Sequence, residues 1–327
     1  MMTKRTKYGI YLAMLSLAAV WGAFSSLYRS GSCRTDFTFR TMGTIARFSF
    51  TGTSSRQAER AAMLAKQEFD RVIQIADLHR SESELSRLNR SAFQQEFFCS
   101  DEMWQMLQEA RFACRFSGGA FDITVKPLMD LWGFYRKRGK APSPEEIREV
   151  LKQTGFDKLH FDDRRKSIRF RSSGMALDLG GIAKGFALDR ARERLRQEGV
   201  TGILDLGGNL AFLPGKPAGK ARVYRVAVKD PGNPRRLAGG VLEVAPGMAV
   251  STSGDYERLV EYNGRRYGHI IDPVSGEPAA PECSATVVFP SAMRADWLST
   301  AVFLRGAALA EKAEKELKNC RVWMVKK

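Results

Sequence analysis

The sequence predicts an α+β fold, in which helices and strands share one domain without the regular alternation of a parallel βαβ sheet. Helix-like and strand-like periodicities follow each other irregularly along the chain, and no break in composition divides residues 36–327. Of the 327 residues, 44% are hydrophobic and 27% are charged, as in average globular proteins. We therefore expect a single folded domain, and we exclude a disordered chain, a coiled-coil rod and a multi-span membrane protein.

Residues 1–35 are a separate segment. Lys4, Arg5 and Lys7 precede an uncharged, largely apolar run over residues 8–27, a pattern typical of an export signal or membrane anchor. At about 1.5 Å per residue, such a run just spans a hydrocarbon core of about 30 Å. We expect attachment to the inner membrane with residues 36–327 facing the periplasm. Small residues before Cys33 leave a lipoprotein open as an alternative to an uncleaved anchor or a cleaved signal.

The net charge is +16, from 52 Lys and Arg against 36 Asp and Glu. A chain this basic often meets phosphate, in nucleic acid, in lipid head groups or in a nucleotide. The charge alone does not choose among these, but the export pattern argues against a nucleic-acid partner.

The first half of the domain is expected to open with a strand pair and continue with helices. Alternating residues over 37–50 surround a turn at Met42-Gly43-Thr44, and a 3.6-residue apolar period follows over 55–78. Three capped helices follow: one to Asn89 with Ser81 and Glu84 as capping box, one from Ser100 to Gly118-Gly119, and one over 144–153 with Ser143 and Glu146 as capping box.

The second half is expected to be richer in strands. Strand-like segments are Lys158–Phe161, Ile168–Arg171, Met175–Leu179, Ile203–Leu206, Val223–Lys229, Leu242–Val244 and Met248–Ser251. Asn263-Gly264 predicts a type I′ hairpin that pairs Glu261 with Arg266 and Arg258 with His269. Residues 136–140 and 231–240 read as loops, and Ser291 caps a helix near the C-terminus.

The five cysteines do not indicate a zinc site, because none lies in a Cys-x-x-Cys pair or near a histidine. A Cys99–Cys114 disulfide in an oxidising compartment and buried free thiols both stay open.

A repeated Leu-Asp-Leu-Gly-Gly motif is the first candidate for chemistry. It occurs at residues 177–181 and 204–208, and the first copy leads into Lys184 and a helix. A strand that ends in glycines lets backbone amides approach a phosphate, and a lysine beside it favours an anion site. The spacing matches neither the Walker nor the Rossmann pattern, so a plain turn remains the alternative.

Three further segments carry polar groups. Asp296 and Thr300 lie four residues apart on the helix near the C-terminus and project hard oxygen ligands, which suit Mg²⁺ or Ca²⁺, from one face. His269 follows the hairpin, and Asp122 follows the helix that ends at Gly118-Gly119. Each has a plainer alternative. Asp296 would be a solvated carboxylate, His269 a histidine with its hydrogen bonds made within the fold, and Asp122 a loop carboxylate.

Taken together, the order and spacing of these segments resemble the ApbE family, the exported FAD:protein FMN transferases. The resemblance covers about 260 residues and rests on Met42-Gly43-Thr44, Ser83 to Asn89, Gly118 to Phe134, Asp178 to Asp189, Ser253 to Tyr256, His269 to Gly276 and Ala295 to Thr300. It implies an α+β fold and an enzyme that uses FAD and Mg²⁺. Such an enzyme releases AMP and attaches FMN through a phosphoester to Thr or Ser of flavoprotein subunits in membrane redox complexes.

The resemblance also implies roles for individual residues. The residues implied to surround FAD are Met42, His79, Ala120, Phe121, Asp122, Asp178, Lys184 and Ile270. The metal ligands implied are the carbonyl of Gly181 with Asp296, Ser299 and Thr300. His269 would activate the acceptor hydroxyl. One departure is His79-Arg80, where family members commonly have Tyr before Arg or a small polar residue. The smaller ring leaves room for water, so the balance of transfer and hydrolysis stays open.

Two rival functions differ in class. An FAD pyrophosphatase on the same site would release FMN and AMP to the medium, and product analysis separates it from a transferase. A non-catalytic flavin carrier would bind FAD without turnover, but Asp296, Thr300 and His269 argue against it.

Overall fold

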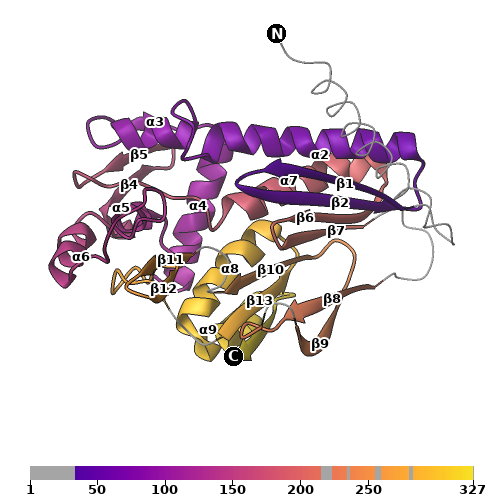
Figure 1. Cartoon of the computed structure of the whole chain (residues 1–327). Coiled ribbons are helices and arrows are strands. Elements are labelled where there is room, and N and C mark those ends of the chain that lie inside the picture. Colours follow the sequence, from indigo (N-terminus) through magenta and orange to yellow (C-terminus); the bar gives the residue numbers. More distant parts are fainter. Residues whose placement is uncertain (1–33, 215–222, 234–235, 255–258, 280–282, 327) are drawn as a thin grey trace, which may run out of the picture.

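The computed structural model describes residues 34–214, 223–233, 236–254, 259–279 and 283–326 (Figure 1). Most of the expected export segment, with Cys33, lies outside the described residues. No helix within the described ranges is long and apolar enough to cross a membrane.

A seven-stranded sheet forms the centre of the domain, with every neighbouring pair antiparallel in the order β1-β2-β6-β7-β10-β13-β14. The strands are β1 (Arg34–Thr41), β2 (Thr44–Thr51), β6 (Thr201–Leu206), β7 (Asn209–Pro214), β10 (Ala249–Gly254), β13 (Cys283–Phe289) and β14 (Arg321–Lys326). Antiparallel pairing needs no helical crossovers, so helices and strands interleave irregularly in the chain.

Helices cover one face of this sheet. They are α2 (Ser55–Ala76), α7 (Ala183–Leu195) and α8 (Ala292–Arg305), with α4 (Asp101–Phe116) and α9 (Ala307–Glu316) packed beside them. The main core lies between these layers, where Phe48 meets Phe69 edge to face at 5.5 Å and Trp297 is fully buried. Burying aromatic rings of this size is the main source of stability here.

The opposite face of the sheet is covered by a hairpin of β8 (Tyr224–Lys229) and β9 (Leu237–Val244), which Figure 1 shows below β7 and β10. Adjacent residues in one strand serve opposite faces: Val250 belongs to the cluster under the hairpin, whereas Ala249 belongs to the main core. This is the two-residue period of a strand buried on both sides.

A third layer closes the end of the domain next to the helices. Its helices are α3 (Glu84–Ser91), α5 (Lys126–Leu131) and α6 (Pro144–Leu151). Its strands form a small sheet of β3 (Phe97–Phe98), β5 (Ser167–Phe170) and β4 (Leu159–Asp162), and a hairpin of β11 (Leu259–Tyr262) and β12 (Arg265–Gly268). Short 3-10 turns lie at Ile123–Val125, Phe156–Lys158 and Arg196–Glu198. Two hydrogen bonds of 2.8 Å join its parts: Tyr262 donates to the Trp132 carbonyl, and the Trp132 indole donates to the Gly276 carbonyl.

Several local predictions are confirmed. Asn263 and Gly264 have φ angles of 50° and 75°, as a type I′ turn requires, and Glu261 pairs with Arg266. Ser143 and Glu146 form the predicted capping box. The predicted pairing of Arg258 with His269 lies outside the described residues.

Other local predictions are wrong. Met175–Leu179 is not a strand: the Leu177 amide donates to the Asn89 side chain at 2.7 Å and the Asp178 amide to the Ile123 carbonyl at 2.7 Å, so neither joins a ladder. The helix after His79 is capped by Ser83, which accepts from the Ser86 amide, and not by Ser81. The loop predicted over 231–240 ends early, because β9 begins at Leu237.

Among the cysteines in the described ranges, Cys99, Cys114 and Cys320 are free thiols, so the Cys99–Cys114 disulfide is not formed. Burial raises the pKa of Cys99, Cys114 and Cys320 to about 12. These thiols therefore stay protonated at neutral pH and pack as small apolar groups.

Candidate active site

A cleft of about 730 Å³ opens where the β1–β2 turn, the end of α2, the start of α7, α8 and the segment after β12 meet. Twelve of the thirteen residues singled out from the sequence line it: Met42, His79, Ala120, Phe121, Asp122, Asp178, Gly181, Lys184, His269, Ile270, Asp296 and Thr300. The thirteenth, Ser299, is fully buried behind Thr300. The volume of the cleft, and its lining of both polar and apolar residues, suit a dinucleotide-sized ligand.

The first Leu-Asp-Leu-Gly-Gly copy forms a turn on the cleft wall. One carboxylate oxygen of Asp178 accepts from the Gly180 amide at 2.7 Å, and the other accepts from the Tyr135 hydroxyl. Gly181 has no room for a side chain, because an added Cβ would lie 2.9 Å from the Phe121 ring. Lys184 donates to the Gly180 carbonyl at 3.2 Å. The turn therefore brings bare backbone and one ammonium group to the cleft, as an anion site requires.

Helix α8 supplies the candidate cation ligands. Asp296 is 4% exposed, and its Oδ2 accepts from the Gly185 amide at 2.9 Å, while its Oδ1 lies 4.0 Å from Lys184 Nζ. This contact needs a glycine at position 185, because a Cβ there would lie 2.3 Å from the Ala292 carbonyl oxygen. Close packing of α7 on α8 thus places the Asp296 carboxylate beside the glycine turn formed by the first Leu-Asp-Leu-Gly-Gly copy.

Hydroxyl groups extend this donor set. Ser253 Oγ lies 3.2 Å from Thr300 Oγ1 and 2.9 Å from Ser299 Oγ, and Ser299 Oγ also lies 3.2 Å from Ser251 Oγ. In the described part of the chain, no three His, Cys, Asp or Glu residues gather to hold a metal. One carboxylate with neutral oxygens is what Mg²⁺ accepts when phosphate oxygens and water complete its shell, so the residues fit that ion.

His269 reaches the cleft from the segment that follows β12. The same segment is tied to the end of α8 by a two-pronged ion pair, in which Arg305 donates to Asp272 at 2.9 and 3.2 Å. Burial alone would raise the pKa of Asp272, but Arg305 and the Val274 amide outweigh it, so this pKa lies below its ordinary value. The pair holds the histidine segment against the helix that carries Asp296.

The far end of the cleft is aromatic and strained. Met42 has a φ of 47° and Gly43 a φ of 69°, so a methionine occupies a left-handed position in the β1–β2 turn. The His79 ring meets the Tyr135 ring edge to face at 5.6 Å. These groups offer flat and flexible apolar surface for a ring system.

Asp122 is the perturbed carboxylate of the cleft. Burial raises its pKa above the ordinary value, although the Thr124 amide and hydroxyl partly oppose the shift and Asp157 adds to it. A raised pKa means that the folded chain binds this proton more tightly than the unfolded chain, so ionising Asp122 costs stability as the pH rises.

We therefore expect Asp122→Asn to raise the free energy of unfolding at pH 7 by about 1 kcal/mol, a typical single-residue effect, while lowering affinity for the ligand of the cleft. Denaturant unfolding between pH 4 and 7.5 measures this. The gain should shrink as the pH falls, and Asp70→Asn, at a surface pair with Lys66, should show no such gain. A variant less stable than the parent at pH 7 would refute the interpretation.

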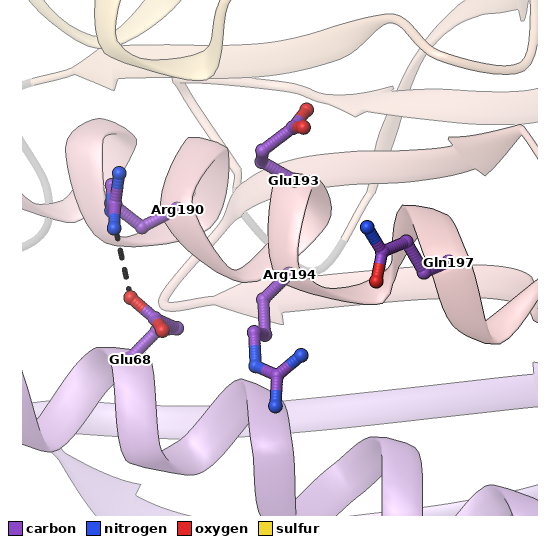
Figure 2. Close-up of a pocket in the computed structure, with 5 residues that line it drawn as sticks. All are labelled: Glu68, Arg190, Glu193, Arg194 and Gln197. Atoms are coloured by element: carbon purple, nitrogen blue, oxygen red, sulfur yellow. Dashed lines mark ion pairs between the residues drawn. The ribbon is translucent and has the colours of Figure 1, made fainter.

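A smaller hollow of about 210 Å³ lies between α2 and α7 (Figure 2). Glu68 of α2 and Arg190 of α7 face each other across it at 3.5 Å. It shares no residue with the cleft, and the pair joins the two helices.

The sequence did not single out three groups of the cleft. Tyr135 stands in what reads as a loop, Asn209 follows the second glycine pair, and Lys229 ends β8. The repeated motif, which ends just before Asn209, could have indicated that this residue lies in the cleft. No local sequence pattern indicates Tyr135 or Lys229.

The fold and the cleft define an α+β protein in which a glycine turn with a lysine lies beside a buried carboxylate and several hydroxyl groups. The profile of the ApbE family matches residues 42–324, and the chain belongs to this family. Both the resemblance seen in the motifs and the predicted fold class are confirmed.

Individual relatives agree. The FAD:protein FMN transferase of Haemophilus influenzae is 30% identical over 289 residues, which cover 85% of this chain and 80% of the relative. The solved ApbE protein of Thermotoga maritima superposes with a TM-score of 0.81 and 30% identity, over 90% of this chain and 94% of its own. Flavin transferase ApbE of Vibrio cholerae gives a TM-score of 0.78 and 26% identity, over 91% and 94%.

Proposed function

We propose that this protein, a flavin transferase of the ApbE family, cleaves FAD and attaches FMN through a phosphoester to a Thr or Ser of an acceptor protein. The acceptors proposed are flavoprotein subunits of membrane redox complexes. The observation that carries the proposal is the meeting of Asp296, Lys184 and His269 in one cleft. The names of the relatives support the same reaction.

The reaction is a displacement at phosphorus. A bond forms between the acceptor oxygen and the FMN phosphorus, and the bond from that phosphorus to the bridging oxygen breaks. AMP leaves with the electron pair, and the hydroxyl proton passes to His269 and then to solvent. An unactivated alcohol and a negatively charged diphosphate both oppose this step, so the site must supply a base and positive charge.

The residues divide these tasks. Lys184, beside the backbone of the glycine turn, would hold the diphosphate, and Asp296 with Thr300 and the Gly181 carbonyl would hold Mg²⁺. When bound, the ion neutralises diphosphate charge that would repel the nucleophile. His269, a residue type with an ordinary pKa near 6.5, accepts the hydroxyl proton at neutral pH. Met42, His79 and Tyr135 form the wall on which the ring systems of FAD rest.

Incubation with FAD, Mg²⁺ and a purified acceptor domain from a redox-complex flavoprotein subunit tests the proposal. The acceptor should gain the mass of FMN less one water, on one Thr or Ser, and EDTA should prevent the gain. An acceptor that stays unmodified while FMN and AMP appear would replace transfer by hydrolysis.

We also propose that residues 1–35 export or anchor the chain, with Cys33 as the lipidated residue in the lipoprotein alternative, and that residues 36–327 form the catalytic domain in the periplasm. The basic start and apolar run support this orientation. An alkaline phosphatase fused after Cys33, which works only outside the cytoplasm, should be active. An inactive phosphatase, with the matching cytoplasmic reporter active, would contradict the orientation.

A further inference from the structure

The β8–β9 hairpin has an inner face that the fold uses. Val228, Leu242 and Val244 are buried against Phe212 and Val250 of the central sheet. These contacts account for the presence of the hairpin, and they place the alternate residues of β8 and β9 on the solvent side.

The solvent side of the hairpin carries two large apolar side chains that do not pack on the sheet. Leu237 is 62% exposed and Val241 is 48% exposed. Leu237 pairs with Lys229 and Val241 pairs with Ala227, with a register irregularity between the two pairs, and all four residues are exposed. We name these four residues the hairpin outer face. Exposed apolar residues need no explanation by themselves, so the significance of these two lies in their position beside Lys229, which lines the cleft.

Lys229 joins this face to the cleft. It is exposed, it lines the cleft, and no carboxylate within the described ranges forms an ion pair with it. The cleft's other lysine, Lys184, already faces Asp296 at 4.0 Å and the Gly180 carbonyl at 3.2 Å. Lys229 thus offers an uncommitted positive charge at the edge of the cleft, beside exposed apolar side chains.

We propose that the hairpin outer face is the docking surface for the acceptor protein. This rests on the proposed function, which requires a protein hydroxyl to enter the cleft from outside. The segment that fits has apolar side chains for Leu237 and Val241 and a carboxylate close to the modified Thr or Ser for Lys229. The net charge of +16 favours such an acidic partner. A second copy of this chain would bring the same positive charge to the face.

Steady-state transfer kinetics, with the acceptor domain and FAD varied separately, test the docking surface. Leu237→Asp and Lys229→Glu should each raise the KM for the acceptor about tenfold, the usual loss at a central interface residue, and leave the KM for FAD unchanged. Met63→Asp is the matched control, because Met63 is 55% exposed on α2, away from the cleft. Leu237→Ser, which adds no charge, should give a smaller effect in the same direction.

Charge reversal sharpens the test. Changing the acceptor carboxylates beside the modified hydroxyl to lysine should weaken transfer by the parent enzyme, and Lys229→Glu should restore it. Restoration requires that the two charges meet, which a general loss of stability cannot mimic.

Four results would overturn the inference. If the KM for FAD rises in parallel, Lys229 binds FAD. If neither KM changes, the face has no part in transfer. If Leu237→Asp alters only the sedimentation of the enzyme, or only its binding to anionic phospholipid vesicles, the face meets a second copy or a membrane. If the parent enzyme labels no acceptor, the proposed function fails and the inference falls with it. If the acceptor is labelled but the variants leave its KM unchanged, the docking inference is wrong and the proposed function stands.

Discussion

Asp296→Ala should lower flavin transfer by about 10³-fold at ordinary Mg²⁺. Asp296 is the carboxylate among the proposed metal ligands, and it lies 4.0 Å from Lys184. Without it the ion is held by neutral oxygens alone, so diphosphate charge is exposed to the incoming hydroxyl. Transfer measured against Mg²⁺ concentration should shift strongly toward higher Mg²⁺.

A conservative variant separates metal loss from misfolding. Asp296→Asn keeps an oxygen for the Gly185 amide and removes only the charge, so it should fold like the parent and remain inactive at ordinary Mg²⁺. Asp296→Ala leaves that amide unpaired, which costs about 1–3 kcal/mol of stability. An Asn variant with the parent's activity and Mg²⁺ dependence would refute the metal assignment.

His269→Ala should lower the rate of a single turnover by about 10²–10⁴-fold and leave the Kd for FAD nearly unchanged. A general base acts on the hydroxyl proton, whereas in the proposed site FAD is held by Lys184, the glycine turn and the wall formed by Met42, His79 and Tyr135. Binding and turnover should therefore separate. FAD titration and single-turnover transfer measure the two quantities.

The pH profile adds a readout that a structural role would not move. Transfer by the parent should fall on the acid side as an imidazole becomes protonated, and His269→Ala should lose that limb and recover part of its rate with added imidazole. His160→Ala, on β4 outside the cleft, should match the parent. Loss of FAD affinity in step with the rate would make His269 a binding residue instead.

Local chemistry made much of the fold predictable. Asn263-Gly264 can adopt the two positive φ angles of a tight hairpin, and Ser143 with Glu146 satisfies the first amides of α6. The strand predicted over Met175–Leu179 is absent, because the amides of Leu177 and Asp178 donate to Asn89 and Ile123, which are distant in sequence. Strand β13 escaped prediction because all seven of its residues are buried, so it shows no alternation.

The cleft was predictable only through its motifs. Asp296 and Thr300 share a helix face by spacing alone, but their meeting with Lys184 depends on α7 packing on α8 at Gly185. The Tyr135 hydroxyl donates to Asp178 from a segment that has no local sequence pattern. Lys229 is placed at the cleft by the β8–β9 hairpin, which packs on the face of the sheet opposite the helices. Such groups are set by tertiary packing, which sequence periodicity does not encode.

The balance of products tests the central claim most directly. AMP, free FMN and acceptor-bound flavin should be quantified together after incubation of the enzyme with FAD, Mg²⁺ and the acceptor domain. We predict one acceptor-bound flavin for each AMP released, with little free FMN, and no bound flavin with Asp296→Asn. AMP matched by free FMN, with the acceptor unmodified, would contradict the account.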